Sequence, residues 1–278
     1  MMDSVDKKIL LSLFKDGRIS QRKIADEVKL SATSLNYRFN KLIEDKIIRS
    51  FVLYVNPNFY GKYVGRVSFK NIKDFDSSFV NVKVRCLEET TFYEIEGNSI
   101  NDLQDKISYM RKELGEYDMI YLSQQNPQKP SGVDIEIVKT LIKNPRMEIG
   151  EIAKEINIPS KTIIRRLNVL INKNLIKIIP EIDLSKSDIV VFGIFSSIVN
   201  KMEFLKQCEF LRFTDGDRGV VVCAVDNVKV AENYVSQVKM SDHNSKIMIA
   251  TDYEIRNDNA RNELERIEKD AILNSIDN

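Results

Sequence analysis

Residues 31–50 have the sequence SATSLNYRFNKLIEDKIIRS, and residues 159–178 have the sequence PSKTIIRRLNVLINKNLIKI. Apolar side chains recur in both segments at i, i+4, i+7 and i+8, which is the spacing of one face of an α-helix. The longer segments 6–56 and 134–184 align at a constant offset of 128 without a gap. A register kept over this length indicates an internal duplication and predicts the same fold twice.

Each copy is predicted to hold three helices and a wing strand. The first helix starts near residue 5 and ends at Asp16-Gly17, where a glycine breaks the apolar pattern. Ser20 and Ser31 are suited to cap the second and third helices. The third helix is expected to bury Leu35, Phe39, Leu42 and Ile43 in the first copy, and Ile163, Leu167, Leu170 and Ile171 in the second. The β-prone segment 47–55 completes a winged helix-turn-helix.

The segments that follow each copy have a strand-rich pattern. In the second half, four strands and helices near 202–208 and 228–239 give a β-α-β-β-α-β order, which indicates a ferredoxin-like domain. The first half is expected to place a helix around 79–87, a short strand at 89–91 and a helix at 100–114. The fold class is therefore α+β, with two winged helix-turn-helix domains, each followed by a ferredoxin-like domain. The predicted divisions are 1–56, 57–123, a linker at 124–132, 133–183, 184–256 and a C-terminal helix at 257–278.

The composition is that of a folded protein with unevenly distributed charge. Of 278 residues, 43% are hydrophobic and 30% are charged, which argues against disorder. The chain has 42 basic and 41 acidic residues, but residues 1–55 hold 11 basic and 7 acidic side chains, and residues 130–179 hold 9 and 5. Both copies of the repeated unit thus lie in basic blocks, which favours an anionic partner.

Cysteine usage and hydropathy indicate a cytoplasmic protein. The three cysteines are odd in number and have no C-x-x-C spacing, so free thiols in a reducing compartment are expected. The sequence has no apolar run of the length of a signal peptide core or a membrane span, which is about 20 residues. No membrane partner is expected.

The outward face of the third helix is predicted to contact double-stranded DNA. In the first copy this face carries hydrogen-bonding groups and two positive charges without a negative one, which suits base edges and phosphates in the major groove. The candidate residues are Ser31, Thr33, Ser34, Asn36, Tyr37, Arg38 and Lys41. Near the wings, Arg49 and Lys177 are candidates for phosphate contact.

The second copy offers Ser160, Lys161, Thr162, Arg165 and Arg166 on the same face. It has Ile164 where the first copy has Asn36. Two interpretations stay open for this face: DNA binding with Ile164 against a thymine methyl group, or contact with another protein. Arg38 and Arg166 occupy equivalent positions, and each suits either a phosphate contact or an ion pair with a carboxylate of the preceding helix.

The segment DKKILLSLFKDGRISQRKIADEVKLSATSLNYRFNKLIEDKIIRS, residues 6–50, resembles the N-terminal domain of the Lrp/AsnC family of transcriptional regulators. The matching features are the Asp-x-x-Ile-Leu opening, the DGR and IA motifs, Arg38 and the II pair before the wing. The resemblance implies base or phosphate contacts from Ser31, Thr33, Ser34, Tyr37 and Arg38. It also implies a small-molecule, amino-acid-like effector site near the Gly-Asp turn, which here corresponds to Asp215, Gly216 and Asp217.

Family members typically have one helix-turn-helix and one α/β domain, whereas this chain has two of each. The duplication predicts a fused pseudo-dimer with two unequal reading heads, whose half-sites lie about one helical turn apart. Whether the chain stays a monomer or forms a homodimer of pseudo-dimers is open from the sequence.

Catalytic and metal-binding patterns are sparse. The single histidine, His243, lies in the polar segment SDHNSK, and no H-x-x-x-H, Walker or G-x-S-x-G motif occurs. We therefore expect no enzyme activity, no catalytic residue, no metal and no cofactor. Two alternatives remain. Siroheme decarboxylases resemble the same two-domain unit, and a scaffold could use the winged-helix fold for protein contacts.

Overall fold

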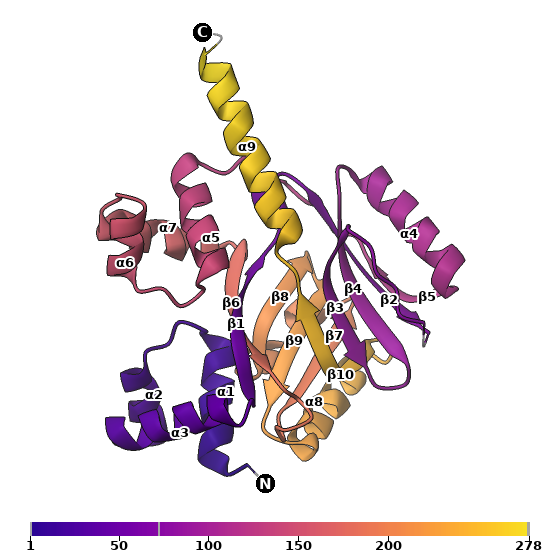
Figure 1. Cartoon of the computed structure of the whole chain (residues 1–278). Coiled ribbons are helices and arrows are strands. Elements are labelled where there is room, and N and C mark those ends of the chain that lie inside the picture. The colour runs from indigo at the N-terminus through magenta and orange to yellow at the C-terminus, as the bar shows by residue number, and fades with distance from the viewer. Residues whose placement is uncertain (1, 72, 277–278) are drawn as a thin grey trace.

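The computed structural model describes residues 2–71 and 73–276 and places two similar heads beside one large sheet (Figure 1). The first head consists of α1 (Ser4–Lys15), α2 (Gln21–Val28), α3 (Ala32–Glu44) and β1 (Ile48–Val55). The second consists of α5 (Gly132–Lys143), α6 (Ile149–Glu155), α7 (Ser160–Asn172) and β6 (Ile176–Ile182). Both copies thus have the three helices and the wing strand that the sequence predicts.

The two wing strands pair with each other. β1 and β6 form an antiparallel two-stranded sheet between the heads, with Val52 opposite Ile179. Leu53 of β1 packs into the core of the second head, and Ile179 of β6 packs into the core of the first. Each head therefore has a complete core only when the other copy's strand is present.

The two α/β segments form one continuous sheet of eight strands. Its order is β5-β2-β4-β3-β10-β7-β9-β8, and β10 joins the halves by pairing with β3 on one side and β7 on the other. The strands are β2 (Tyr63–Lys70), β3 (Val80–Cys86), β4 (Thr90–Gly97), β5 (Tyr117–Tyr121), β7 (Val190–Ser196), β8 (Glu209–Asp215), β9 (Arg218–Val225) and β10 (Lys246–Ile255).

Helices cover the outer faces of the half-sheets. α4 (Ile100–Leu114) buries Ile107 in a core with Val67 of β2, and α8 (Val228–Ser241) buries Val238 in a core with Phe192 of β7. The inner faces turn toward each other, since the rings of Tyr121 in β5 and Phe195 in β7 have centroids 5.9 Å apart. The α+β fold class with ferredoxin-like halves is confirmed.

Two α-helices predicted from the sequence, at 79–87 and 202–208, are absent from the structure. Most of the segment 79–87 forms strand β3 (Val80–Cys86), because Val80, Val82 and Val84 alternate with polar residues and β-branched side chains favour the pleated conformation. In place of a helix at 202–208 the chain makes two short 3-10 turns, η2 (Val199–Lys201) and η3 (Glu203–Gln207). A third 3-10 turn, η1 (Pro57–Tyr60), follows β1.

The third helix of each head buries one residue fewer than expected. Leu35, Phe39 and Leu42 are buried, but Ile43 is 42% exposed, and its counterpart Ile171 is 39% exposed. A residue at i+8 is rotated past the centre of the apolar stripe, so it lies at the edge of the packed face. The prediction that both isoleucines face inward was wrong.

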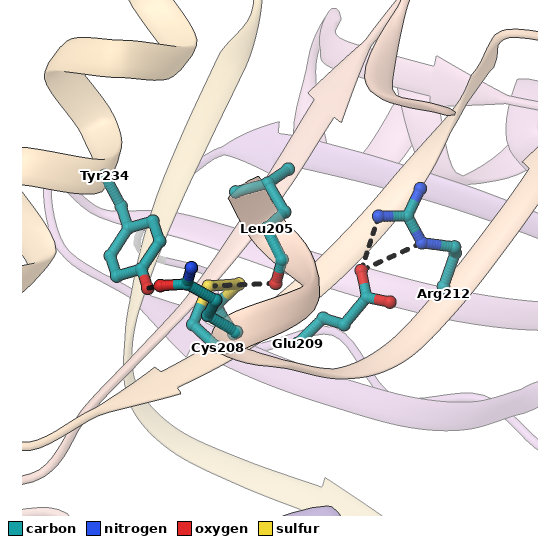
Figure 2. Close-up of a disulfide and its surroundings, with 7 residues drawn as sticks. Leu205, Cys208, Glu209, Arg212 and Tyr234 are labelled. Carbon is teal, nitrogen blue, oxygen red and sulfur yellow. Dashed lines mark hydrogen bonds and ion pairs between the residues drawn. A yellow bond between two sulfur atoms is a disulfide. The ribbon is translucent and has the colours of Figure 1, made fainter. Parts of the chain in front are cut away.

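Two of the three cysteines form a disulfide. Cys208 and Cys223 are joined at the β8–β9 pair, where antiparallel pairing brings residues 15 positions apart in sequence next to each other (Figure 2). The prediction of three free thiols was wrong because the pairing of β8 and β9 is not visible in the cysteine spacing. Cys86 is a buried free thiol, and burial raises its pKa to about 12.

The chain ends in α9 (Asp258–Ile276), whose first half packs on the second head. Ala260 and Leu264 are buried in the same core as Ile135 of α5, whereas the far half extends away from the body (Figure 1). The apolar spacing of Leu264, Ile267, Ala271 and Ile276 in the sequence predicts one packed face of this helix, but the side chain of Ile276 lies outside the described residues. Within residues 2–71 and 73–276, no helix combines the length and apolar character needed to cross a membrane.

Candidate nucleic-acid interface

The turn before α3 places the N-terminus of this helix at the surface of the first head. Lys29, at the end of α2, adopts a left-handed conformation with φ of 57°, and Ser31 then caps α3 by accepting a hydrogen bond from the Ser34 amide at 3.1 Å. The Ser31 hydroxyl also donates to the Ser34 hydroxyl at 2.8 Å. These local bonds fix the first turn of α3, where Thr33 and Ser34 point to solvent.

The outward face of α3 gathers most of the residues predicted to contact DNA. Tyr37 is 69% exposed, which is unusual for an aromatic side chain without a partner. The other exposed members of this face are Ser31, Thr33, Ser34, Asn36 and Lys41. The face is polar, carries a positive charge and has no carboxylate, so it suits the base edges and phosphates of a major groove.

Arg38 contacts carboxylates of its own head. Its guanidinium Nη1 lies 2.6 Å from Asp3 and 2.9 Å from Asp6, and the hydrogen bonds to Asp6 and Asp3 raise its pKa. Asp3 in turn caps α1 by accepting from the Val5 and Asp6 amides. An ion pair is present, but its carboxylates belong to α1 and its cap and not, as the sequence interpretation had it, to the preceding helix α2. A phosphate contact by Arg38 stays a prediction.

The second head repeats this ion pair in a more buried form. Arg166 of α7 makes two parallel bonds to Asp134 of α5, whose side chain is only 4% exposed. Burial alone would raise the pKa of Asp134, but the hydrogen bonds from Arg166 and Ser131 outweigh it and lower the pKa. The arginine of the repeat therefore links the third helix to the first helix in both heads.

The outward face of α7 is less uniform than that of α3. Ser160, Lys161 and Arg165 are exposed and Thr162 is half-buried. Ile164 is 47% exposed in the middle of this face, so the polar character is interrupted. The N-cap of α7 is Pro159, which makes no side-chain capping bond.

The two predicted wing cations are engaged within the protein. Arg49 of β1 lies 3.0 Å from Asp183 and remains half exposed. Lys177 of β6 donates to the Lys15 carbonyl at 2.9 Å, at the end of α1, and burial lowers its pKa. Contacts of these side chains with phosphates stay predictions, and each would compete with a bond inside the chain.

A pair of arginines that we did not predict as functional joins the two heads. Arg18 donates to the Pro145 carbonyl at 3.1 Å and to the Met147 carbonyl at 2.6 Å. Its counterpart Arg146 donates to the Ile19 carbonyl at 3.1 Å and lies 4.7 Å from the ring centroid of Phe51. Burial lowers the pKa of both arginines. The sequence feature that could have identified this pair is that Arg18 recurs as Arg146 at the offset of 128 that relates the two copies.

These reciprocal bonds hold the heads in a fixed relation. Gly17, next to Arg18, lies so close to β6 that a Cβ atom would approach the Ile178 carbonyl oxygen to 2.4 Å. Only glycine permits this approach, so the turn after α1 rests directly on the wing of the other head.

The residues predicted for an effector form an exposed hairpin turn. Gly216 has φ of 59° and closes the turn between β8 and β9. Asp215 accepts from the Gln124 amide at 2.9 Å, and Asp217 pairs with Lys201 at 2.7 Å. The turn is therefore tied to the connection after β5, and effector binding there stays a prediction.

No metal centre is present among the described residues, since no group of three or more histidine, cysteine, aspartate or glutamate side chains converges. His243 is exposed.

Comparisons with known proteins agree with this geometry. Residues 2–49 and 131–177 each match the family model described as winged helix-turn-helix DNA-binding. An HTH-type transcriptional regulator of Pyrococcus abyssi is 43% identical over 56 residues, which are 20% of this chain and 38% of that protein. The regulator FL11 of the same organism is 26% identical over 119 residues, 43% of this chain and 68% of FL11. LrpA of Bacillus subtilis is 39% identical over 56 residues, 20% of this chain and 41% of LrpA.

The solved structures that match this chain have low sequence identity and low TM-scores. The siroheme decarboxylase NirDL covers 99% of this chain and 100% of its own, with 13% identity and a TM-score of 0.42. LrpC of Bacillus subtilis covers 46% of this chain and 99% of its own, with 21% identity and a TM-score of 0.34. The matched segment spans less than half the length of the first of the sequence relatives.

Both heads are thus winged helix-turn-helix units of the DNA-binding class. They are of Lrp/AsnC type, as the sequence motifs predict, and they occur as a tandem pair within one chain.

Proposed function

We propose that the protein is a sequence-specific DNA-binding transcriptional regulator of Lrp/AsnC type in which one chain supplies both reading heads. The observation that carries this proposal is the exposed, polar face of α3, with Tyr37 69% exposed, on a unit that matches a DNA-binding family model. The arginine contacts between the heads support a fixed spacing of the two half-sites. The proposed domain division is the one predicted from the sequence, with winged-helix units at 1–56 and 133–183.

The proposal is tested by measuring the affinity of the full chain for fragments of its own promoter region, at several salt concentrations. A regulator prefers specific fragments over random DNA, and its affinity falls as salt rises because bound phosphates release counterions. Equal affinity for all fragments, with no dependence on salt, would refute it.

For the second head, protein contact is a competing role, because Ile164 and Ile171 are both exposed on α7. A chain with Ile164→Asn, which restores the residue of the first head, separates the two roles. If α7 reads DNA, this variant changes sequence preference. If it contacts a protein, DNA affinity stays constant.

We propose that the chain is not an enzyme, and the curated relatives, which are transcriptional regulators, support this. A siroheme decarboxylase would bind its tetrapyrrole. Adding siroheme or haem to the protein and recording the absorption spectrum tests this alternative. A saturable spectral shift would support tetrapyrrole binding and contradict the proposal.

A further inference from the structure

A cavity of about 100 Å³ lies between the inner faces of the two half-sheets. Most of its lining is apolar, and it comes from both halves of the chain: Val84 and Phe92 from the first, Phe213 and Val222 from the second. Apolar cavities of similar size in proteins, about 150 Å³, stay dry and accept molecules as large as benzene. The volume of this cavity therefore suits a small organic molecule.

The wall of the cavity contains one buried ion pair. Arg66 of β2 and Glu94 of β4 have side chains that are only 4% and 3% exposed, and Arg66 Nη2 lies 2.7 Å from Glu94 Oε2. The Tyr54 hydroxyl lies 3.0 and 3.1 Å from the two carboxylate oxygens of Glu94. The Arg66 guanidinium also lies over the ring of Phe213, 3.8 Å from its centroid. Tyr54 thus donates to the carboxylate of Glu94, and the nearby guanidinium of Arg66 neutralises its charge.

Arg66 has hydrogen-bonding capacity left over. Although its Nη2 is close to Glu94, neither Nη2 nor Nε directs an N–H at an acceptor among the residues that the structure describes. A buried donor without an acceptor is costly, and native proteins supply a partner from the chain, from water or from a ligand. The cavity wall therefore contains N–H donors of Arg66 that lack an acceptor.

Charge balance selects the kind of molecule that fits. The charges of Arg66 and Glu94 cancel, so a ligand carboxylate would add an uncompensated negative charge beside Glu94 in an apolar space. An ammonium group would add an uncompensated positive charge beside Arg66 in the same apolar space. A carbonyl oxygen accepts hydrogen bonds from Arg66 and leaves the charge balanced.

We propose that this cavity binds a small, mostly apolar molecule with one uncharged carbonyl oxygen, which accepts hydrogen bonds from Arg66. The cavity is also lined by Phe14 of α1, Tyr54 of β1 and Ile179 of β6. A molecule bound there touches the first head and both wing strands. The site is separate from the exposed turn at Asp215–Asp217, and the binding does not depend on the proposed DNA function.

A matched pair of probes tests the charge argument. Butanone carries a short apolar body and a carbonyl group and is smaller than benzene, and propionate has the same skeleton with an anionic oxygen in place of the methyl group on the carbonyl carbon. Each is titrated at neutral pH into the full chain without DNA, and binding is followed by NMR. We expect saturable binding of the ketone and at least tenfold weaker binding of propionate. Absence of saturable ketone binding, or equal binding of the two probes, would overturn the proposal.

The substitution Gly193→Val locates the binding. Gly193 of β7 lines the cavity, and a Cβ atom there would meet only Met248, at 3.8 and 4.0 Å, so a side chain fits at the cost of the cavity volume. We expect this variant to lose ketone binding and to keep its thermal midpoint. Gly150→Val is the matched control, because a Cβ atom at Gly150 meets nothing within 4 Å. Ketone binding that survives Gly193→Val would show that the molecule binds elsewhere.

The substitution Glu94→Gln tests the role of the ion pair. It removes the negative charge and keeps an acceptor for Tyr54, so Arg66 becomes an uncompensated cation. We expect the affinity for propionate to rise at least tenfold relative to that for butanone. A variant that folds and shows an unchanged preference would contradict the charge argument. If this variant does not fold, the titrations of the unmodified chain and of Gly193→Val still show whether the ketone binds in the cavity.

Discussion

Leu35 in the first head and Ile163 in the second occupy the same position of the repeated unit, and both are fully buried. One residue further along, Asn36 and Ile164 are both exposed and differ in chemistry. The repeated core preserves the fold, because interiors are close-packed and tolerate only side chains of similar volume. The outer faces have no such packing constraint, so the difference between α3 and α7 indicates that the two heads contact different surfaces.

The ion pair between the third and the first helix gives the largest expected difference between the heads. Asp134→Asn should lower the free energy of unfolding by about 2 to 3 kcal/mol, because Asp134 is buried and bonds to a charged partner. Asp6→Asn in the first head should lower the free energy of unfolding by less than about 1 kcal/mol. The ion pair of Asp6 with Arg38 is more exposed, and Arg38 still has its ion pair with Asp3 in this variant. Chemical denaturation of both variants measures the difference. Equal losses would show that the two pairs are energetically equivalent.

The reading faces should differ in sequence preference. Tyr37→Ala should weaken specific DNA binding by about 1 to 3 kcal/mol and leave binding to random DNA unchanged, if Tyr37 contacts a base. Arg165→Ala, at the equivalent position of α7, should weaken specific and random binding alike if Arg165 contacts phosphate. Fluorescence anisotropy at fixed salt measures both, and Lys41→Ala serves as the phosphate control in the first head. Unchanged binding by Tyr37→Ala would remove α3 from the interface.

Substitutions at the N-caps of α3 and α7 should change the stability of the protein in opposite directions. Ser31→Ala removes the side-chain bond to the Ser34 amide and should cost about 1 kcal/mol of stability. Pro159→Ser supplies a cap that α7 lacks and should gain roughly 0.5 kcal/mol. Thermal denaturation gives both values. A loss of stability in Pro159→Ser would mean that the rigid backbone of proline matters more than the missing cap.

The smallest effect concerns pH and the wing strands. Hydrogen bonds from Ser185 and Arg49 lower the pKa of Asp183 from 3.8 to about 2, whereas the equivalent position of β1 is Val55. Because the folded pKa lies below the unfolded one, the stabilisation is present above pH 3.8 and is lost as the pH falls through about 2. Asp183→Asn should remove roughly 0.5 kcal/mol at neutral pH, since Arg49 is half exposed. Below pH 2, the denaturation curves of the variant and the unmodified chain should converge, and a constant gap would contradict this assignment.

Much of each head was predictable because its signals are local. The 3.6-residue period places Leu35, Phe39 and Leu42 on one face, and Ser20 and Ser31 cap the helices that follow them. The polar character of α3 also follows from the sequence, because a residue absent from the apolar stripe points outward. Ile43 was misplaced because it lies at the edge of that stripe.

The contacts between the copies were not predictable in the same way. A strand does not encode its hydrogen-bonding partner. The pairing of β1 with β6 and the pairing of β3 with β10 therefore depend on long-range packing. The disulfide has the same origin, since Cys208 and Cys223 meet only through the β8–β9 pair. Figure 2 shows the bond beside the ion pair of Glu209 and Arg212, which the same strand positions.

The sequence by itself determined that a helix-turn-helix unit occurs twice, that each is followed by a strand-rich domain, and that the outer faces of the two reading helices differ. These properties follow from periodicity, caps and side-chain chemistry, which act over a few residues. Only the tertiary structure decided that Arg18 and Arg146 join the heads and that Arg66 and Glu94 line one cavity. Burial depends on which distant segments cover a side chain, and a strand residue such as Arg66 becomes enclosed only after the two half-sheets close over it.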